Sequence, residues 1–360
     1  MKSLEEALRE VVDRRSRRGR RYELTPVLIF ACTGMLCGCR SLRALAAWGR
    51  RQEREFLRMM GFPRGQAPSF STLRRILSTL DITSFERALS SWAVGVVAQQ
   101  RAQRPRSGYR GLALDGKVLK GSRQGELPGV HVLAALAHDV GMALDQEQVK
   151  AETNEHKASL PLLARLTLTD QVVTADAAFM QRDVCCLITQ RRGHYLIVLK
   201  DNQPQLRQDV RDWFAPFPPP DECQMAYAEE VNSGHGRMER RRLWALPIYA
   251  DCIAWPGARL MLRLERSFTN KRSHKTTVEL DYALCSLGLD QVSAEELLAL
   301  WRGHWHIENR LHWVRDGTLG EDARRVRTGQ APQALAAIGN VVMTTARLAG
   351  FTNIAEALRT

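Results

Sequence analysis

The sequence predicts a mixed α/β fold, in which a helical N-terminal region precedes a mixed sheet flanked by helices. Three observations predict it: the helical periodicity of residues 1–105, the alternation of apolar strands with helices over residues 109–214, and a later run of strand-like segments. Strands that first form hairpins and then alternate with helices build a mixed sheet with helices on its faces. The chain has 360 residues, of which 44% are hydrophobic. This length suggests about two domains, each with a buried core.

The first domain is predicted to comprise residues 1–105 and to be helical. Ser3 and Glu6 match a capping box, which predicts a helix over residues 3–15. The apolar stretch 24–39 has 16 residues, fewer than the roughly 20 that cross a bilayer, and therefore predicts a buried helix. A Ser cap and apolar residues at helical spacing predict a further helix over residues 68–81. Such helices enter DNA grooves in helix-turn-helix proteins, but they are also common in ordinary bundles.

The second domain is predicted to comprise residues 106–360. It follows a linker around residues 100–111, where apolar periodicity is lost and Pro and Gly occur. The elements of residues 109–214 follow the order β-β-β-α-β-α-β-α. Alternating apolar and polar residues over about 217–288 predict a β-rich insertion, and helical periodicity returns from residue 293 onward.

The charge balance indicates the class of binding partner, and the cysteines indicate the redox compartment of the protein. Lys and Arg number 52 against 39 Asp and Glu, a net charge of +13. This excess favours a polyanionic partner, with nucleic acid first and an anionic membrane surface second. The eight cysteines are scattered, and the adjacent Cys185 and Cys186 cannot readily pair with each other. They predict reduced thiols and a cytoplasmic location.

Basic side chains occur in several groups that suit contact with phosphate. The block "RRSRRGRR" over residues 14–21 is either a solvated charge run or a phosphate-binding segment. Two arginines lie on the helix predicted over residues 68–81, and others flank the predicted sheet. The candidates for DNA contact are Arg17, Arg18, Arg20, Arg21, Arg74, Arg75, Lys117, Lys120, Lys200 and Arg315.

Three acidic residues occupy positions where a carboxylate needs a partner. Asp115 follows the apolar run "GLAL" within a strand, where a charge is costly unless it is paired or binds a cation. Asp176 ends the strand "VVTAD", and ligands bind at the carboxyl ends of strands in α/β sheets. Glu308 lies on a late helix. Such a cluster suits Mg²⁺ or Mn²⁺, and two cations held by carboxylates activate a nucleophile and stabilise the leaving oxygen of a phosphodiester.

Each of these acids also has an ordinary structural interpretation. Asp115 suits a turn, Asp176 suits the cap of the next helix, and Glu308 can pair with Arg302 or Arg315. Any one acid alone favours the ordinary interpretation. The three together, on a strand, at a strand end and on a later helix, favour a joint metal site.

The late helix carries several bulky side chains on one predicted face, because residues three and four apart share a face. That face holds Trp301, His304, Trp305, Glu308, Leu311, His312 and Arg315. It predicts that the helix packs on the sheet, that neighbours bury Glu308, and that Trp305 lies in the core. Trp301 or His304 at the rim is a candidate to stack on an unpaired DNA base. A zinc site at His304, Glu308 and His312 is a weaker alternative, because the HExxH pattern is lacking.

Seven stretches of the chain carry a resemblance to a known family. They are "RRGRRYELTPVLIFACTGMLCGCRSLRALAAW", "PSFSTLRRIL", "LALDGKVLKGS", "VVTADAAFMQRDVCCLI", "GHYLIVLKDNQPQL", "GHGRMERR" and "HWHIENRLHWVRDGTLGED". Over nearly its whole length, the chain resembles DDE transposases of bacterial insertion sequences, specifically the H-repeat-associated branch. The last stretch is highly specific, whereas "LDGK" and "TADA" gain their weight from the order in which they occur.

The resemblance implies an RNase H-like catalytic core with an acidic triad at Asp115, Asp176 and Glu308. The intervals of 61 and 132 residues agree, since related transposases place a β insertion in the second interval. It also implies Mg²⁺, with Mn²⁺ as a substitute, hydrolysis of a DNA strand at the element's end, and attack of the freed 3′-OH on target DNA. The implied partners are double-stranded DNA and a second copy of the chain on that DNA, in the nucleoid. Neither a membrane nor a small-molecule substrate is expected.

The chain departs from the family around the glutamate. Related transposases carry Tyr-x₂-Arg-x₃-Glu-x₆-Lys, and here those positions hold Trp301, His304, Glu308 and Arg315. The contacts expected with the DNA at the element's end therefore differ from those of the family, because Arg and Lys are not equivalent. Two other functions remain compatible with the sequence: a basic DNA-binding relative that has lost catalysis, and a metal-dependent nuclease without strand transfer.

Overall fold

The computed structural model describes residues 2–18, 20–104, 108–215, 225–234, 236–249 and 252–359. The chain forms two compact units. The first comprises Met1–Arg106, Gly116–Glu152 and Ile307–Thr360, and the second comprises Ser107–Asp115 and Thr153–His306. The predicted boundary near residue 105 coincides with the end of the first segment. Two later segments nevertheless cluster with the N-terminal helices, so the division into residues 1–105 and 106–360 stays a prediction.

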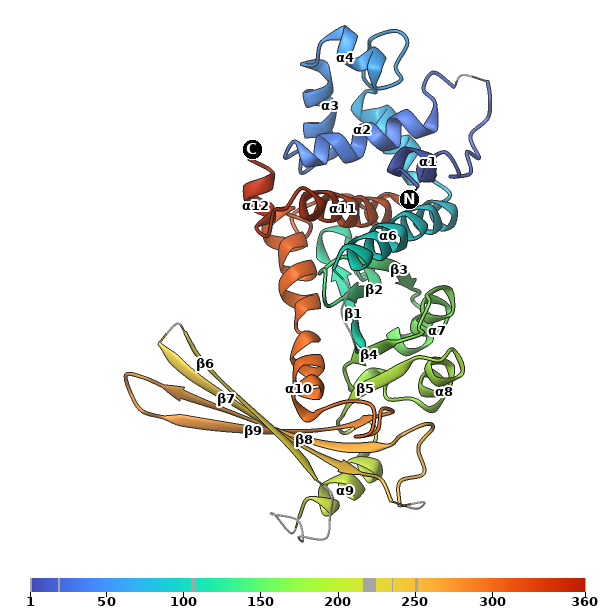
Figure 1. Ribbon diagram of the computed structural model, residues 1–360. Helices are drawn as coiled ribbons and strands as arrows, with labels where there is room; N and C mark the ends of the chain where they lie inside the picture. Colours follow the sequence, from blue (N-terminus) through green and yellow to red (C-terminus); the bar gives the residue numbers. More distant parts are fainter. Residues whose placement is uncertain are drawn as a thin grey trace. The chain divides into compact units, whose positions relative to one another are not determined.

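The strands form one nine-stranded mixed sheet in the order β3-β2-β1-β4-β5-β9-β8-β7-β6 (Figure 1). Their bounds are β1 Arg110–Leu119, β2 Val130–Ala137, β3 Ala143–Val149, β4 Gln171–Ala175, β5 His194–Leu199, β6 Ala226–Gly234, β7 Arg237–Pro247, β8 Leu260–Asn270 and β9 Thr276–Cys285. β1 pairs in parallel with β4, and β4 with β5, whereas β2 and β3 pair antiparallel, as do β5 and β9. The predicted mixed sheet with flanking helices, as in RNase H-like cores, is confirmed.

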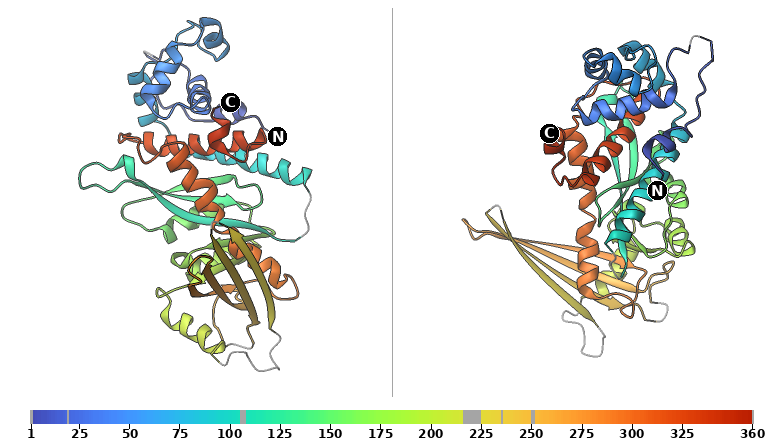
Figure 2. Two further views of the ribbon diagram at one scale, coloured as in Figure 1. Left: turned by 90° about the vertical axis from the view of Figure 1, so that its left-hand side faces the viewer. Right: turned by 45° about the horizontal axis from the view of Figure 1, so that its top comes forward.

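In the second unit, β6 to β9 form long antiparallel strands that correspond to the predicted β-rich insertion (Figures 1 and 2). The part of the insertion over residues 216–224 lies outside the described residues. Because β9 pairs with β5, the insertion continues the central sheet. The helices of this unit are α7 Glu155–Arg165, α8 Arg182–Gln190, α9 Pro204–Trp213 and α10 Ala294–Gly303.

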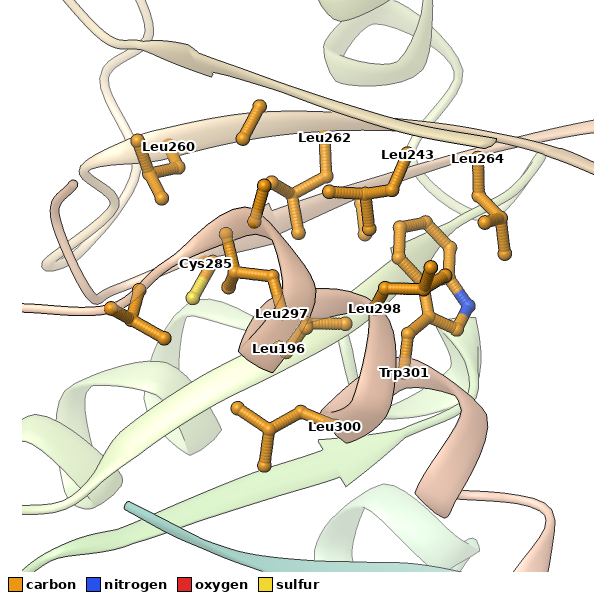
Figure 3. Packing of buried hydrophobic residues seen from close by; sticks show 14 of the residues in the cluster. Leu196, Leu243, Leu260, Leu262, Leu264, Cys285, Leu297, Leu298, Leu300 and Trp301 are labelled. Atoms are coloured by element: carbon orange, nitrogen blue, oxygen red, sulfur yellow. The ribbon is translucent and has the colours of Figure 1, made fainter. Parts of the chain in front are cut away.

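Helix α10 covers the insertion strands with its apolar face. Its start is fixed by a capping box between Ser293 and Glu296. Leu297, Leu298 and Trp301 extend from this helix into a cluster of leucines from the strands (Figure 3). This packing attaches α10 to the strands of the insertion.

The first unit contains the N-terminal helices together with two C-terminal ones. Their bounds are α1 Leu4–Leu8, α2 Leu24–Leu36, α3 Leu42–Arg50, α4 Arg54–Met59, α5 Phe70–Ser78, α6 Ile82–Gln103, α11 Ala331–Leu348 and α12 Ile354–Ala357. Helix α11 is buried along most of its length and packs on α2, α6, β2 and β3.

Two predictions about the N-terminal helices fare differently. The apolar helix α2 is largely buried, as predicted. Among the described residues, no helix is long and apolar enough to cross a membrane. The helix predicted over residues 3–15 ends at Leu8, so that prediction is wrong in length. Beyond it the chain makes tertiary contacts instead, and the Val12 backbone N–H donates to Ser84 Oγ at 3.0 Å.

A polar cluster is buried between α6, β3 and α11. The side-chain amides of Gln146 and Gln333 donate to Glu86 Oε1 at 2.6 and 2.8 Å. Burial raises the pKa of Glu86 to about 7 from its ordinary 4.5, and the two hydrogen bonds oppose that rise only in part. Glu86 is therefore a carboxyl group that the fold prefers to keep protonated.

We expect the free energy of unfolding to decrease as the pH rises from 4.5 to about 7, the interval between the ordinary and the folded-state pKa of Glu86. In this interval the unfolded chain releases the proton while the folded chain retains it, so the stabilisation is complete below 4.5 and is lost through about 7. The shift corresponds to about 2–4 kcal/mol. Urea unfolding across this interval should show the decrease in the wild type and in the control Glu53→Gln, but a flatter profile in Glu86→Gln. Equal profiles for all three proteins would contradict the assignment.

Candidate active site

Two predicted site residues lie where the parallel pairing of β1 with β4 ends, in the second unit. Residues 110–114 of β1 pair with residues 171–175 of β4, and Leu114 opposite Ala175 is the last pair of that register. Asp115 and Asp176 follow these two residues directly. Both strand segments are apolar and buried, which fixes their register, whereas Asp115 is half-buried and Asp176 is exposed. The register therefore places Asp115 and Asp176 on neighbouring strands, at the point where the pairing of β1 with β4 ends.

The ordinary role considered for Asp176 is not observed. Asp176 precedes a short 3₁₀ turn over Ala177–Phe179, but its side chain makes no capping hydrogen bond there. Lys200 follows the neighbouring strand β5, and its Nζ lies 3.9 Å from Asp176 Oδ1. The Asp176 carboxylate thus lies near the ammonium group of Lys200, and more than half of the Asp176 side chain is exposed.

His304 lies beside the same two aspartates. Its Nδ1 is 3.3 Å from Thr174 Oγ1, on the strand that leads to Asp176. Burial lowers the pKa of His304, while the negative charges of Asp176 and Asp115 act in the opposite direction. Both carboxylates are therefore close enough to interact with the imidazole, and His304 belongs to this site from the side of the helix.

Glu308 belongs to the first unit, where it begins a π-helical turn over Glu308–His312. The predicted burial of Glu308 is wrong, because the residue is exposed. One of its carboxylate oxygens lies within 4.8 Å of a ring nitrogen of His312. The sheet brings Asp115 and Asp176 together, whereas the participation of Glu308 stays a proposal.

The regular helical face predicted over residues 301–315 is interrupted. After α10 the chain forms π-helical turns over Glu308–His312 and Val314–Thr318, whose wider turns displace the side chains from the spacing of an α-helix. Trp301 is buried with 5% exposure, so it is not available to stack on a base. Trp305 is 52% exposed, and the prediction that it lies in the core is wrong. Arg266 lies over its ring, 5.5 Å from the centroid.

Arg315, predicted to contact phosphate, is fully buried with 0% exposure. Its Nε and Nη2 donate to the two carboxylate oxygens of Glu321 at 2.7 and 3.1 Å. This bidentate pair holds the π-helical segment to the loop that follows it. The structure therefore contradicts a direct phosphate contact for Arg315.

The lysines predicted around the core differ in accessibility. Lys117 has a side chain that is only 9% exposed, and its Nζ lies 2.5 Å from Asp316. Its predicted phosphate contact is contradicted, because an almost buried ion pair occupies the ammonium group. Lys120 is exposed, and its Nζ lies 3.2 Å from Asp322 Oδ2. Lys120 and Lys200 remain candidates for DNA contact.

Most of the predicted N-terminal arginines line one hollow of about 520 Å³ in the first unit. Arg18, Arg20, Arg21 and Arg75 line it together with Arg15. Arg15 and Arg20 pair with Asp13 at 2.7 and 3.2 Å, so they hold the segment in place. The exposed Arg17 does not line this hollow, and Arg74 lines a different one.

That second hollow has a volume of about 770 Å³ and includes arginines that the sequence analysis missed. They are Arg40, Arg43, Arg324, Arg325 and Arg327. The only signal in the sequence was the basic run "RRVR" over residues 324–327. A short basic run far from Arg40 and Arg43 in the chain is a weak signal until folding brings these residues together.

The comparisons with known proteins cover almost the whole chain. The family model described as "Transposase DDE domain" matches residues 106–343, and "DDE_Tnp_1-associated" matches residues 5–93. "Putative transposase YncI" of Escherichia coli O157:H7 is 27% identical over 339 residues, which cover 91% of this chain and 83% of that protein. "H repeat-associated putative transposase YhhI" of Escherichia coli K12 is 24% identical over 353 residues, which cover 95% and 90%.

A third relative, "Uncharacterized protein in dhlA 3'region" of Xanthobacter autotrophicus, is 29% identical over 261 residues, covering 70% of this chain and 84% of that protein. A solved structure, the piggyBac transposase synaptic complex with hairpin DNA, covers 98% of this chain and 76% of its own, with a TM-score of 0.42 and 12% identity. The family model over residues 106–343 spans well over half of the sequence. The chain therefore belongs to the family of transposases with a DDE domain.

Proposed function

We propose that this protein is a metal-dependent transposase, which cleaves a DNA strand at the end of its element and transfers the freed 3′-OH into target DNA. The observation that carries the proposal is the placement of Asp115 and Asp176 on two adjacent parallel strands, each directly after the last residue pair that joins β1 to β4. This placement supports the assignment of both residues to the acidic triad of the family. Because two element ends must be joined, we propose that the chain acts as a dimer on DNA.

The chemistry of the donor groups fits a hard divalent cation. Members of the DDE transposase family generally use a divalent metal. Asp115 and Asp176 offer carboxylate oxygens, which are the ligands that Mg²⁺ and Mn²⁺ prefer. A bound cation would lower the pKa of an attacking water and offset the charge that develops on the phosphate oxygens. We propose Glu308 as the third carboxylate of the site.

The other groups at the site have supporting roles in this proposal. Lys200, which extends from the end of β5 toward Asp176, is placed to bind a phosphate oxygen of the DNA strand. His304, whose Nδ1 lies 3.3 Å from Thr174 Oγ1, is a polar neighbour of the two aspartates on the helix side of the site. Trp305 is exposed beside Arg266, where its ring can stack on an unpaired base, as base–aromatic stacking requires no particular sequence.

An assay on the element's own ends tests the proposal. The genomic sequence that flanks the gene should contain inverted repeats, and a duplex bearing them serves as substrate. With Mg²⁺ we expect a nick at the repeat end and a product in which that 3′ end is covalently joined to a second DNA. Chelation of the metal should abolish both products. Cleavage without joining would identify a nuclease, and the absence of Mg²⁺-dependent cleavage on these ends would leave a DNA-binding relative without catalysis.

A further inference from the structure

Helix α5 lies between two hollows that are lined by arginines, both in the first unit. The arginine groove, of about 770 Å³, is lined by Arg40, Arg43, Arg74, Arg324, Arg325 and Arg327. The arginine pocket, of about 520 Å³, is lined by Arg15, Arg18, Arg20, Arg21 and Arg75. Arg74 and Arg75 are consecutive residues of α5, yet each lines a different hollow. The helix therefore separates the two.

The spacing along α5 explains this arrangement. Phe70 and Arg74 line the arginine groove, whereas Thr72, Arg75 and Thr79 line the arginine pocket. With about 3.6 residues per turn, the first pair and the last three residues fall on nearly opposite sides of the helix.

The remaining two sides of α5 differ in burial. Leu73, Ile76 and Leu77 are buried and attach the helix to the unit, while Ser71 is exposed on the outer side. The outer side of α5 is thus a ridge of small and basic residues, with arginines on both flanks.

The positive charge of the arginine groove is not neutralised from within. No aspartate or glutamate lines it. Within the part of the chain that the structure describes, no ion pair involves Arg43, Arg325 or Arg327, and Arg74 only donates to Thr328 Oγ1 at 3.2 Å. Like charges that are held together in this way require counterions or an anionic partner.

The groove is also built to keep its shape. The buried Arg324 donates from Nε to the Arg40 carbonyl at 3.0 Å and from Nη2 to the Leu319 carbonyl at 2.9 Å. Arg43 lies over the Phe70 ring, 5.0 Å from its centroid. These contacts tie together three segments, the start of α3, helix α5 and the loop over residues 320–328. A single small anion would engage few of these arginines, whereas a polyanionic strand can contact all three segments.

We propose that α5, the arginine groove and the arginine pocket together form one docking surface for duplex DNA. The ridge of α5 faces the major groove, the arginine groove contacts the phosphates of one strand, and the arginine pocket contacts those of the other. The identity of the partner rests on the proposed function. A major groove of about 12 Å accepts an α-helix, and phosphates border it on both sides.

Binding of a duplex by the full-length protein in the presence of a chelator tests this surface without requiring catalysis. The double variants Arg325→Ala/Arg327→Ala and Arg18→Ala/Arg21→Ala each remove two exposed arginines. Each should flatten the slope of log Kd against log salt by about 1.8, since each phosphate contact contributes about 0.9. The control Arg58→Ala/Arg64→Ala removes the same charge from exposed positions outside both hollows and should keep the wild-type slope.

A variant of the ridge itself separates docking by α5 from general charge attraction. Ser71→Glu places an acid in the first turn of α5, where the helix dipole favours it, so the helix should remain folded. We expect this variant to weaken duplex binding by about tenfold or more, because the phosphates of the DNA strands that face α5 repel the new carboxylate. Wild-type slopes in both double variants, or wild-type affinity in Ser71→Glu, would overturn the docking surface. A protein that binds the duplex in this way but does not cleave it would contradict only the proposed function.

Discussion

Asp115→Asn and Asp176→Asn should each reduce Mg²⁺-dependent strand cleavage by about 1,000-fold or more. Each change keeps the size and polarity of the side chain but removes a charge from the proposed cation site. Loss of several kcal/mol of metal-based stabilisation corresponds to about three powers of ten in rate, because about 1.4 kcal/mol is one tenfold step. Nicking of a labelled element end in single-turnover reactions measures this effect. Duplex binding without metal should stay at the wild-type level.

The matched control for these variants is Asp212→Asn, an exposed carboxylate on α9 whose side chain accepts a hydrogen bond from Gln208 at 2.6 Å. It should cleave at the wild-type rate. Glu308→Gln is expected to resemble the two aspartate variants, since we propose that it completes the triad. Full cleavage by Glu308→Gln, together with inactive aspartate variants, would remove Glu308 from the site and leave the two aspartates in it. Full cleavage by Asp115→Asn or Asp176→Asn would contradict the catalytic assignment of that residue.

Arg315→Met should lower the free energy of unfolding by about 3–5 kcal/mol, because it leaves Glu321 buried without its partner. Replacing both members of the pair, in Arg315→Met/Glu321→Met, should recover part of this loss, since buried ion pairs can be replaced by apolar groups at little cost. Denaturant unfolding at neutral pH measures both effects. A single variant as stable as the wild type would show that the pair does not hold the loop.

The conservative variant Arg315→Lys distinguishes this structural role from the phosphate contact that the sequence suggested. Lysine keeps the positive charge but cannot form the bidentate pair with Glu321. We therefore expect a less stable protein whose DNA binding keeps the wild-type salt dependence. A slope that decreases by about 0.9 in Arg315→Ala but not in Arg315→Lys would instead indicate a phosphate contact.

The sequence by itself determined the elements whose signal is local. The apolar runs before Asp115 and Asp176 predicted one strand that contains a carboxylate and one that ends in a carboxylate, and the parallel pairing of β1 with β4 brings the two residues to neighbouring strands. The buried helix α2 and the capped helices α5 and α10 were likewise predictable, since capping residues and apolar spacing act over a few residues. The predicted helix over residues 3–15 failed because tertiary contacts, not local propensity, determine where α1 ends.

Only the tertiary structure decided which polar and aromatic side chains are accessible. Helix α10 ends at Gly303, before Trp305, and π-helical turns replace the regular helix after residue 307. Trp305 and Glu308 are exposed and Arg315 is buried, which a regular 3.6-residue period could not predict. The arginine groove combines Arg43 with Arg325 and Arg327, residues more than 280 positions apart in the chain. Periodicity in a sequence reveals which face of an element is apolar. The partner of a charged side chain, in contrast, depends on distant segments that meet only when the chain has folded.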